Sequence, residues 1–347
     1  MKNKNKVLIK NILLSLITIA LFLFFFEVSL RTFGPKRDIV IVPTILMKSN
    51  NSILFYEMKP NASIIRNGIN ITINSKGMRD LEYEIEKKIN VYRIAVLGDS
   101  VTANIDLNLS DIYTEKLERK LNLKVKNKKF EVLNFGVNGY GIIQELEVLR
   151  EKVLKSNPDI VIIGYVLNDP LPSDTIINFY IKQEERKNNI CKIYSIGVKI
   201  PCGLRDFVDE LKIAEFIYAK LFNIKYTFGD DYYTRLYKNN SSYVTLTKSF
   251  NEIRMIAKRN NIKVVLVIFP LIKDLKNYRW EKIHSALSEE AIKSNFIVID
   301  LLDEYRKYEE EKIKLRKNDI LHPNKFGQEV AADFIYKRLS EENLITI

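Results

Sequence analysis

The sequence predicts an α/β fold with a doubly wound parallel sheet, preceded by an N-terminal transmembrane helix. From residue 91 onward, short apolar runs alternate with helical patterns, which is typical of strands joined by covering helices. The runs are continuously apolar instead of alternating, and this indicates strands buried on both faces. The first 31 residues hold a long apolar stretch behind a group of lysines. With 347 residues, the chain is long enough for one large domain with additions or for two small ones.

Residues 1–31 are predicted to be a membrane anchor. The apolar run 12–26, extended by apolar residues on both sides, approaches the ~20 residues that cross a bilayer. Lysines before the run favour a cytoplasmic N-terminus, whereas Arg31 and further basic residues behind it weaken this inference. A cleaved signal peptide is the alternative, but residues 26–31 contain no A-x-A pattern. We therefore expect a single-pass cell-membrane protein whose remaining chain is extracytoplasmic.

Residues 32–90 are predicted to form a β-rich preface packed on the domain that follows. Within it, residues 64–74 favour a hairpin around Asn67-Gly68, followed by a strand with alternating side chains. Residues 74–80 are rich in turn formers.

Residues 91–347 are predicted to form the main α/β domain. Its elements follow from apolar runs of strand length and from amphipathic helical patterns. The predicted strands are 93–97, 130–134, 160–166, 263–269 and 296–300. The predicted helices are 110–122, 142–155, 244–259, 281–293 and 324–340.

An insertion at about 170–243 interrupts this alternation of strands and helices. It carries many tyrosines, a predicted helix near 203–222 and both cysteines of the chain, Cys191 and Cys202. Long insertions of this kind form lids or binding walls, and a purely structural excursion is the alternative. The cysteine spacing excludes a CxxC metal site. Outside the cytoplasm the two cysteines would close a disulfide, and two unpaired thiols are the alternative.

The chain is basic, with a formal net charge of +12. A basic surplus fits nucleic acid, an anionic membrane or an acidic polymer as partner. The lysines are scattered, however, and many stand beside glutamates, as in Glu115-Lys116, which indicates a solvated surface. No nucleic-acid-binding motif and no metal-ligand cluster accompanies them. We expect no nucleic-acid partner, no metal and no cofactor.

Three of the predicted strands are followed by loops whose residues suit acyl-transfer chemistry. Ser100 follows the first strand, residues 134–141 after the second strand contain three glycines, and Asn168 follows the third. The carboxyl ends of parallel strands meet at one edge of a sheet, where ligands bind. A serine there is exposed near a helix N-terminus, glycines let backbone N–H groups approach a ligand, and an asparagine amide can donate to an oxyanion. Taken singly, each loop is also explained as an ordinary turn or helix cap.

The chain contains only two histidines, His284 and His322. His322 has a carboxylate three residues upstream, Asp319, and Pro323 follows it. A serine, a histidine and an aspartate are the parts of a nucleophilic triad, in which the aspartate fixes the imidazole tautomer. His284 lies in an ordinary amphipathic helix, so we expect a surface or half-buried side chain there.

Four blocks in this order resemble those of the SGNH/GDSL hydrolase family. They are Gly98-Asp99-Ser100, residues 134–139, Asn168-Asp169 and residues 319–322. The resemblance covers roughly residues 91–340, with gaps at the insertion. The preface is similar to that of membrane-anchored bacterial members, which carry an Asn-Ser-x-Gly-x-Arg-Asp stretch, here residues 74–80.

The resemblance implies a three-layer α/β/α sandwich and a role for each matched residue. Ser100 is implied as the nucleophile and first oxyanion donor through its backbone N–H, with Gly139 and the Asn168 side chain as the second and third donors. His322 is implied as the base and Asp319 as its partner. Family members often carry a glycine shortly after the first block, and the absence of one here bears on the shape of the acyl pocket.

We therefore expect a serine-dependent esterase that acts on O-acyl, in particular O-acetyl, esters of cell-envelope carbohydrate through an acyl-Ser100 intermediate. Three alternatives stay open: an O-acetyltransferase of a surface glycan, a lipid esterase, and a non-catalytic glycan-assembly subunit. A binding module has no chemical need of an intact triad. The sequence does not determine the acyl group, the acceptor or the oligomeric state.

Overall fold

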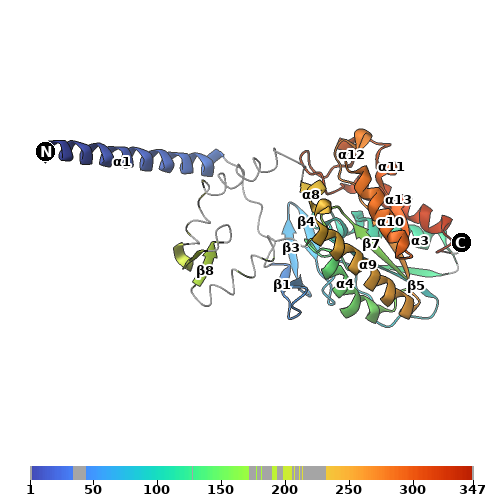
Figure 1. Cartoon of the computed structure of the whole chain (residues 1–347). Helices are drawn as coiled ribbons and strands as arrows, with labels where there is room; N and C mark the ends of the chain where they lie inside the picture. Colours follow the sequence, from blue (N-terminus) through green and yellow to red (C-terminus); the bar gives the residue numbers. More distant parts are fainter. Residues whose placement is uncertain are drawn as a thin grey trace. The chain divides into compact units, whose positions relative to one another are not determined.

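The computed structural model describes residues 2–33, 44–126, 128–171 and 232–345, together with 177, 181, 190–193, 198–204, 207, 211 and 213. The chain divides into two compact units (Figure 1). One unit consists of Met1–Val40 and Ile181–Asp231, and the other of Ile41–Tyr180 and Tyr232–Ile347.

Among its described residues, the first unit has a long helix and a β-hairpin. Helix α1 spans Lys2–Phe33, and its segment Ile9–Phe33 is long and apolar enough to cross a membrane. Strands β8 (Ile190–Ile193) and β9 (Val198–Pro201) pair antiparallel. Cys202 directly follows β9 and is disulfide-bonded. The helix expected near 203–222 lies largely outside the described residues.

The second unit is built on a five-stranded, fully parallel sheet, which confirms the predicted α/β fold. Its strand order is β11-β10-β7-β5-β6. The strands are β5 (Val91–Gly98), β6 (Lys129–Asn134), β7 (Ile160–Tyr165), β10 (Lys263–Ile268) and β11 (Ile297–Asp300). The chain runs from β5 to β6 on one side and then returns to β7 on the other side of β5. This reversal makes the carboxyl end of β5 the topological switch point, where open α/β sheets bind their ligands.

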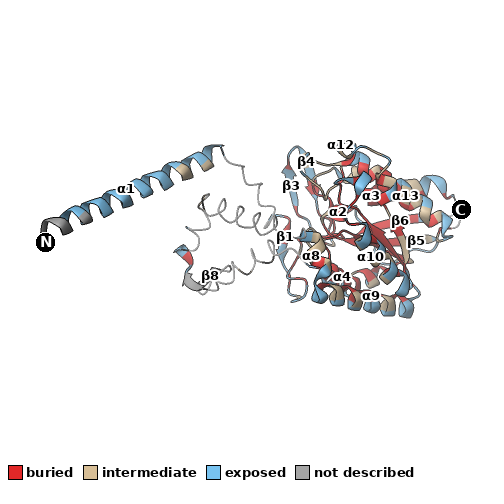
Figure 2. Ribbon diagram, turned by 45° about the horizontal axis from the view of Figure 1, so that its top comes forward, coloured by how far each residue is buried: buried red, intermediate tan, exposed pale blue. Residues whose placement is uncertain are grey.

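Helices cover both faces of the sheet (Figure 2), and the strands between them are largely buried, as continuously apolar runs require. Helix α3 packs against α13, and helix α4 packs against α9 and against strand β5. The bounds are α3 (Tyr113–Lys124), α4 (Ile142–Glu151), α9 (Asn240–Asn260), α10 (Glu281–Lys293) and α13 (Lys325–Glu341).

Three helix boundaries differ from the sequence prediction by three residues or more. One of them is the start of α9, which lies at Asn240 instead of residue 244. Helix α3 begins at Tyr113 instead of residue 110, because Leu109–Asp111 forms a separate 3-10 turn. Helix α4 ends at Glu151, and a second 3-10 turn carries the chain to Asn157, whose φ of 48° stops the helical path. The start of α13 is where the sequence puts it, because the Asn324 side chain caps the backbone N–H groups of Phe326 and Gly327.

The preface forms two antiparallel pairs. Strand β1 (Leu46–Lys48) pairs with β2 (Tyr56–Met58), and β3 (Ser63–Arg66) pairs with β4 (Ile69–Thr72). The β3–β4 turn is the predicted Asn67-Gly68 turn, and both residues have positive φ, 50° and 77°. Buried preface side chains, among them Tyr56 and Met78, belong to the same apolar cluster as the sheet.

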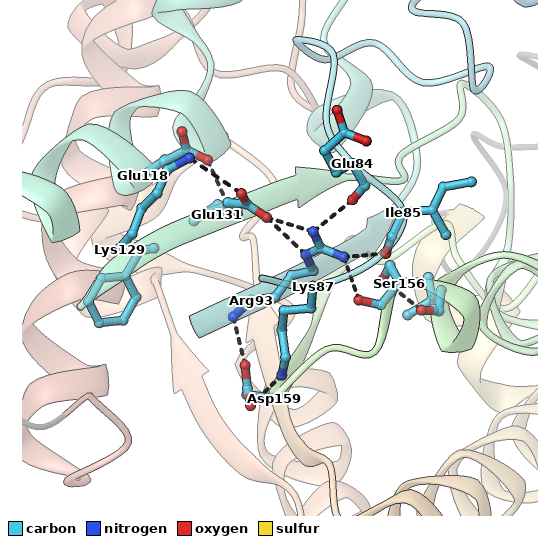
Figure 3. A network of polar contacts seen from close by, with 12 residues as sticks. Glu84, Ile85, Lys87, Arg93, Glu118, Lys129, Glu131, Ser156 and Asp159 are labelled. Atoms are coloured by element: carbon cyan, nitrogen blue, oxygen red, sulfur yellow. Dashed lines mark hydrogen bonds and ion pairs between the residues drawn. The ribbon is translucent and has the colours of Figure 1, made fainter. Parts of the chain in front are cut away.

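A buried arginine network lies at the amino ends of the strands (Figure 3). The Arg93 side chain is 1% exposed and donates to the backbone carbonyls of Ile85 and Ser156 and to the Glu131 carboxylate. Asp159 accepts from the Arg93 backbone N–H and from Lys87. This network joins the end of the preface to the start of the sheet, on the side away from Ser100.

Candidate active site

Ser100 stands at the carboxyl end of β5, as the first residue of the four-residue helix α2 (Ser100–Ala103). The Asp99 carboxylate accepts the Val101 backbone N–H at 2.8 Å and so caps this helix. The strand therefore delivers the serine hydroxyl to the edge of the sheet, at the start of a helix.

The structure brings Ser100, Asp319 and His322 together. His322 Nε2 lies 2.9 Å from Ser100 Oγ, and Nδ1 lies 3.0 Å from both Asp319 carboxylate oxygens. Asp319 also accepts the backbone N–H groups of Leu321 and His322. The carboxylate thus fixes both the loop and the imidazole, and leaves Nε2 facing the serine.

The pKa of His322 is raised above its ordinary value. Burial alone lowers this pKa, but the hydrogen bond and charge of Asp319, with the charges of Asp99 and Asp106, raise it by more. The pKa of Asp319 is lowered although burial acts to raise it, because His322 hydrogen-bonds and attracts the carboxylate. The pair therefore favours an ionised aspartate beside an imidazole that accepts a proton readily.

The three predicted oxyanion donors lie in the segments that follow the carboxyl ends of the adjacent strands β5, β6 and β7. The Asn168 side-chain amide donates to Asp99 at 3.0 Å, which places it against the turn that carries Ser100. The Val137 backbone N–H donates to the Gly98 carbonyl at 3.0 Å, so the loop after β6 also adjoins this turn. Gly139, two residues further along, has a φ of 76°, a conformation that glycine adopts without strain.

The side chain of Thr102 packs closely against three glycines beneath the nucleophile. A Cβ on Gly98, Gly136 or Gly164 would meet Thr102 side-chain atoms at 2.1, 2.7 and 2.6 Å, respectively. Thr102 Oγ1 in turn lies 2.9 Å from the buried Tyr113 hydroxyl. These glycines belong to three different strand ends, so close backbone packing at the site depends on all three.

Three fully buried carboxyl groups lie behind the nucleophile: Asp99, Glu145 and Asp169. Burial raises the pKa of each, and their mutual repulsion adds to this for Glu145 and Asp169. Burial therefore opposes a negative charge on Asp99, whose carboxyl lies 3.4 Å from Ser100 Oγ. Glu145 could not be singled out from the sequence, because it sits in an unremarkable amphipathic stretch.

The expectation for His284 is wrong. Its side chain is 2% exposed, with Nδ1 2.8 Å from Asp300 Oδ2 and Nε2 3.1 Å from the Tyr278 hydroxyl. The amphipathic pattern of its helix suggested a surface or half-buried position, whereas the packing of α10 against β11 buries the side chain. His284 serves as a satisfied core histidine, away from the serine.

Within the described residues, no group of three or more His, Cys, Asp or Glu side chains is placed to hold a metal ion.

The fold and the serine–histidine–aspartate constellation at its switch point define an α/β serine hydrolase. The profile of the GDSL-like lipase/acylhydrolase family matches residues 96–330, and the chain belongs to this family. The four blocks that resemble the SGNH/GDSL family lie within this match. No curated protein matches the sequence.

Several solved structures are similar to the chain at low sequence identity. TesA is 14% identical with a TM-score of 0.43, over 72% of this chain and 98% of its own. A two-domain esterase active on acetylated mannans is 15% identical with a TM-score of 0.44, over 72% of this chain and 49% of its own. An acetylxylan esterase from Geobacillus stearothermophilus is 13% identical with a TM-score of 0.44, over 72% of this chain and 94% of its own.

Proposed function

We propose that the protein is an extracytoplasmic serine esterase that removes O-acyl groups, in particular O-acetyl groups, from cell-envelope carbohydrate. The observation that carries the esterase chemistry of this proposal is the contact of 2.9 Å between Ser100 Oγ and His322 Nε2, with Asp319 behind the imidazole. An unused surface serine has no reason to be aligned with the free nitrogen of a carboxylate-bound histidine at the switch point of the sheet.

In the proposed mechanism, Ser100 attacks the ester carbonyl while His322 takes the hydroxyl proton. The imidazolium, stabilised by Asp319, then protonates the departing alcohol, and an acyl-Ser100 remains. His322 next takes a proton from water as the water oxygen attacks the acyl carbonyl. The imidazolium then gives this proton to Ser100 Oγ as the bond between the acyl group and the serine breaks, so that the acid and the free serine are released. Each proton in this sequence is carried by the imidazole.

The oxyanion formed in each step is assigned to the backbone N–H groups of Ser100 and Gly139 and to the Asn168 amide. Asn168 has two N–H bonds, and Asp99 occupies one of them in this structure. The other remains for the substrate, so Asp99 orients the amide without consuming it.

We further propose three functional segments. Residues 1–31 anchor the protein by one membrane span, residues 32–90 form the preface, and residues 91–347 form the catalytic domain with its insertion at about 170–243. The disulfide at Cys202 supports an oxidising compartment for the part beyond the anchor.

Full-length protein in detergent tests the activity with p-nitrophenyl acetate. We expect Ser100→Ala and His322→Ala to abolish turnover, because they remove the nucleophile and the base. Ser285→Ala is the matched control, since Ser285 is an exposed helix serine that bonds its own helix, at the Glu281 carbonyl. Wild-type turnover no faster than that of Ser100→Ala would overturn the enzyme reading and favour a non-catalytic subunit.

The substrate class needs a second assay. Acetylated xylan and acetylated mannan, with a lipid ester for comparison, are incubated with the wild-type protein and acetate release is measured. Acetate release from the polysaccharides supports the proposal. Turnover of the lipid ester alone would make the protein a lipid esterase, and movement of the acetyl group to an added glycan acceptor would make it a transferase.

A further inference from the structure

The helix that carries Ser100 is too short to stabilise itself. Helix α2 has four residues and ends at Asn104, whose φ of 33° and ψ of 68° turn the chain out of the helix. A single helical turn is unfavourable by itself, because its nucleation is costly and its terminal carbonyls lack intrahelical partners. Groups outside the helix must therefore hold it.

Arg79 of the preface supplies these groups at the end of α2. Its side chain is 1% exposed and donates to the Ala103 carbonyl at 2.8 Å and also to the carbonyls of Asn104 and Leu107. A cation at a helix C-terminus is favourable, and charged donors make the stronger hydrogen bonds. Burial lowers the pKa of Arg79 to about 10, so the guanidinium stays charged at neutral pH.

The next residue, Asp80, supports the same helix from a second side. Asp80 Oδ2 accepts the Asn134 backbone N–H at 2.7 Å, where β6 ends. The Asn134 amide then donates to the Thr102 carbonyl of α2 at 3.0 Å, and its oxygen accepts the Gly136 N–H. Arg79 directly, and Asp80 through Asn134, therefore hold the carbonyls at the C-terminal end of α2.

We propose that Arg79 and Asp80 are positioning residues, which hold α2 so that Ser100 faces His322. The preface is then part of the catalytic unit and not a spacer between the anchor and the enzyme. This inference rests on the proposed function, because it assigns the preface a role in the reaction of Ser100.

Two further contacts of the preface reach the same loops. Asp106, in the turn after α2, accepts from Arg66 of strand β3 at 2.8 Å and from Arg316 at 2.7 Å, so it also ties this turn to the loop that precedes Asp319. The Tyr56 hydroxyl of strand β2 donates to the carbonyl of residue 138, in the loop after β6. The next residue of this loop is Gly139, the proposed oxyanion donor. The preface therefore contacts both the nucleophile turn and the proposed oxyanion loop.

A matched control exists in the same preface–sheet interface. Arg93 is as deeply buried as Arg79 and also donates to backbone carbonyls, but it lies at the amino end of β5 (Figure 3). Arg93→Lys therefore removes the same kind of interaction without touching α2. Once the stability of each variant is taken into account, a remaining difference in kcat between Arg79→Lys and Arg93→Lys reports on the position of the nucleophile.

The test uses detergent-solubilised full-length protein and p-nitrophenyl acetate, with kcat normalised to folded protein. We expect Arg79→Lys to lower kcat by about 10- to 100-fold with little change in KM, since a lysine reaches one carbonyl and a displaced nucleophile loses rate. Arg93→Lys should lower the thermal unfolding midpoint and leave kcat per folded protein unchanged. Where Arg79→Lys fails to fold, Asp80→Asn is measured in the same way, with a smaller loss of kcat expected.

Hydrogen exchange gives a readout that does not depend on turnover. The N–H groups of Ala103 and Asn104 are bonded to the carbonyls of Asp99 and Ser100, so their exchange reports the opening of α2. We expect faster exchange there in Arg79→Lys and not in Arg93→Lys. An unchanged kcat and unchanged exchange in Arg79→Lys would overturn the positioning role and leave the esterase intact. A wild-type protein without esterase activity would overturn the proposed function instead, and the exchange rates would still decide whether Arg79 holds α2.

Discussion

Asp319 uses both of its carboxylate oxygens to hold one imidazole and one loop. Each oxygen lies 3.0 Å from His322 Nδ1, and Oδ1 also accepts two backbone N–H groups of the loop. A carboxylate with so many donors is held rigidly, which fixes the tautomer that leaves Nε2 free to accept a proton from Ser100.

This arrangement predicts how activity depends on pH. His322 must be neutral to act as a base, and its pKa is raised, so kcat/KM in the wild type should rise with pH through an acid limb above the ordinary histidine value of about 6.5. The carboxyl groups that act electrostatically on His322 are Asp319, Asp99 and Asp106. Asp319→Asn removes the largest raising effect, so the limb should move to lower pH while the maximal rate falls by about 10²–10⁴-fold with the loss of the oriented base.

The measurement is kcat/KM for p-nitrophenyl acetate from about pH 5 to pH 9. Asp303→Asn, which alters an exposed carboxylate in the short helix α11 (Leu302–Tyr305), is the control and should leave the profile unchanged. A limb that stays in place in Asp319→Asn would show that His322 is not the group that titrates.

At the scale of elements, the site depends on how closely three strand ends approach one another. Thr102 of α2 fills the space that side chains on Gly98, Gly136 and Gly164 would need. Each glycine lies in a short strand or loop whose local sequence offers no sign of this packing. The requirement arises only because β6, β5 and β7 are neighbours in the sheet.

Gly164→Ala tests this packing. The new Cβ would meet Thr102 Oγ1 and the Tyr113 hydroxyl, each at 2.6 Å, in a buried site where neither can move freely. We expect a loss of roughly 1–3 kcal/mol in the free energy of unfolding and a lower kcat, because α2 shifts. Gly203→Ala is the control, since a Cβ there meets nothing within 4 Å. Thermal and denaturant unfolding measure the first effect, and a Gly164→Ala variant as stable and active as the wild type would contradict this account.

At the scale of the whole molecule, one chain combines a long apolar helix with a buried α/β core. Within the part of the chain that the structure describes, no residue of the segment Ile9–Phe33 is buried against other residues. A helix of this composition in a soluble protein would bury its apolar side chains. Near the end of the segment, Glu27 pairs with Arg31 and accepts the backbone N–H of Ile213 at 2.8 Å. This polar end fits the proposed outer interface of the membrane.

The proposed anchor predicts the fractionation of the protein. Full-length protein should stay with membranes after high-salt and alkaline washing, because burial of about 20 apolar residues in lipid is insensitive to both. A variant with Leu16→Arg and Leu21→Arg in α1 should be released, whereas Val244→Arg, an exposed apolar residue of the second unit, should not. Recovery of a shortened soluble wild-type chain would instead show cleavage of a signal peptide.

The sequence by itself determined the α/β class, the five strands and the residues with triad chemistry. These follow from local patterns: continuous apolar runs define the strands, and a chain with two histidines offers few choices of base. The preface hairpin was equally readable, since Asn67-Gly68 suits a turn with two positive φ values.

Only the tertiary structure decided the strand order, and with it the meeting of Ser100 with His322, 222 positions away along the chain. Strand order depends on long-range pairing that local periodicity does not encode. The burial of His284 and the contacts of Arg79 were beyond the sequence for the same reason. A histidine in an amphipathic helix, or an arginine in a turn, acquires its partners only when distant segments pack around it.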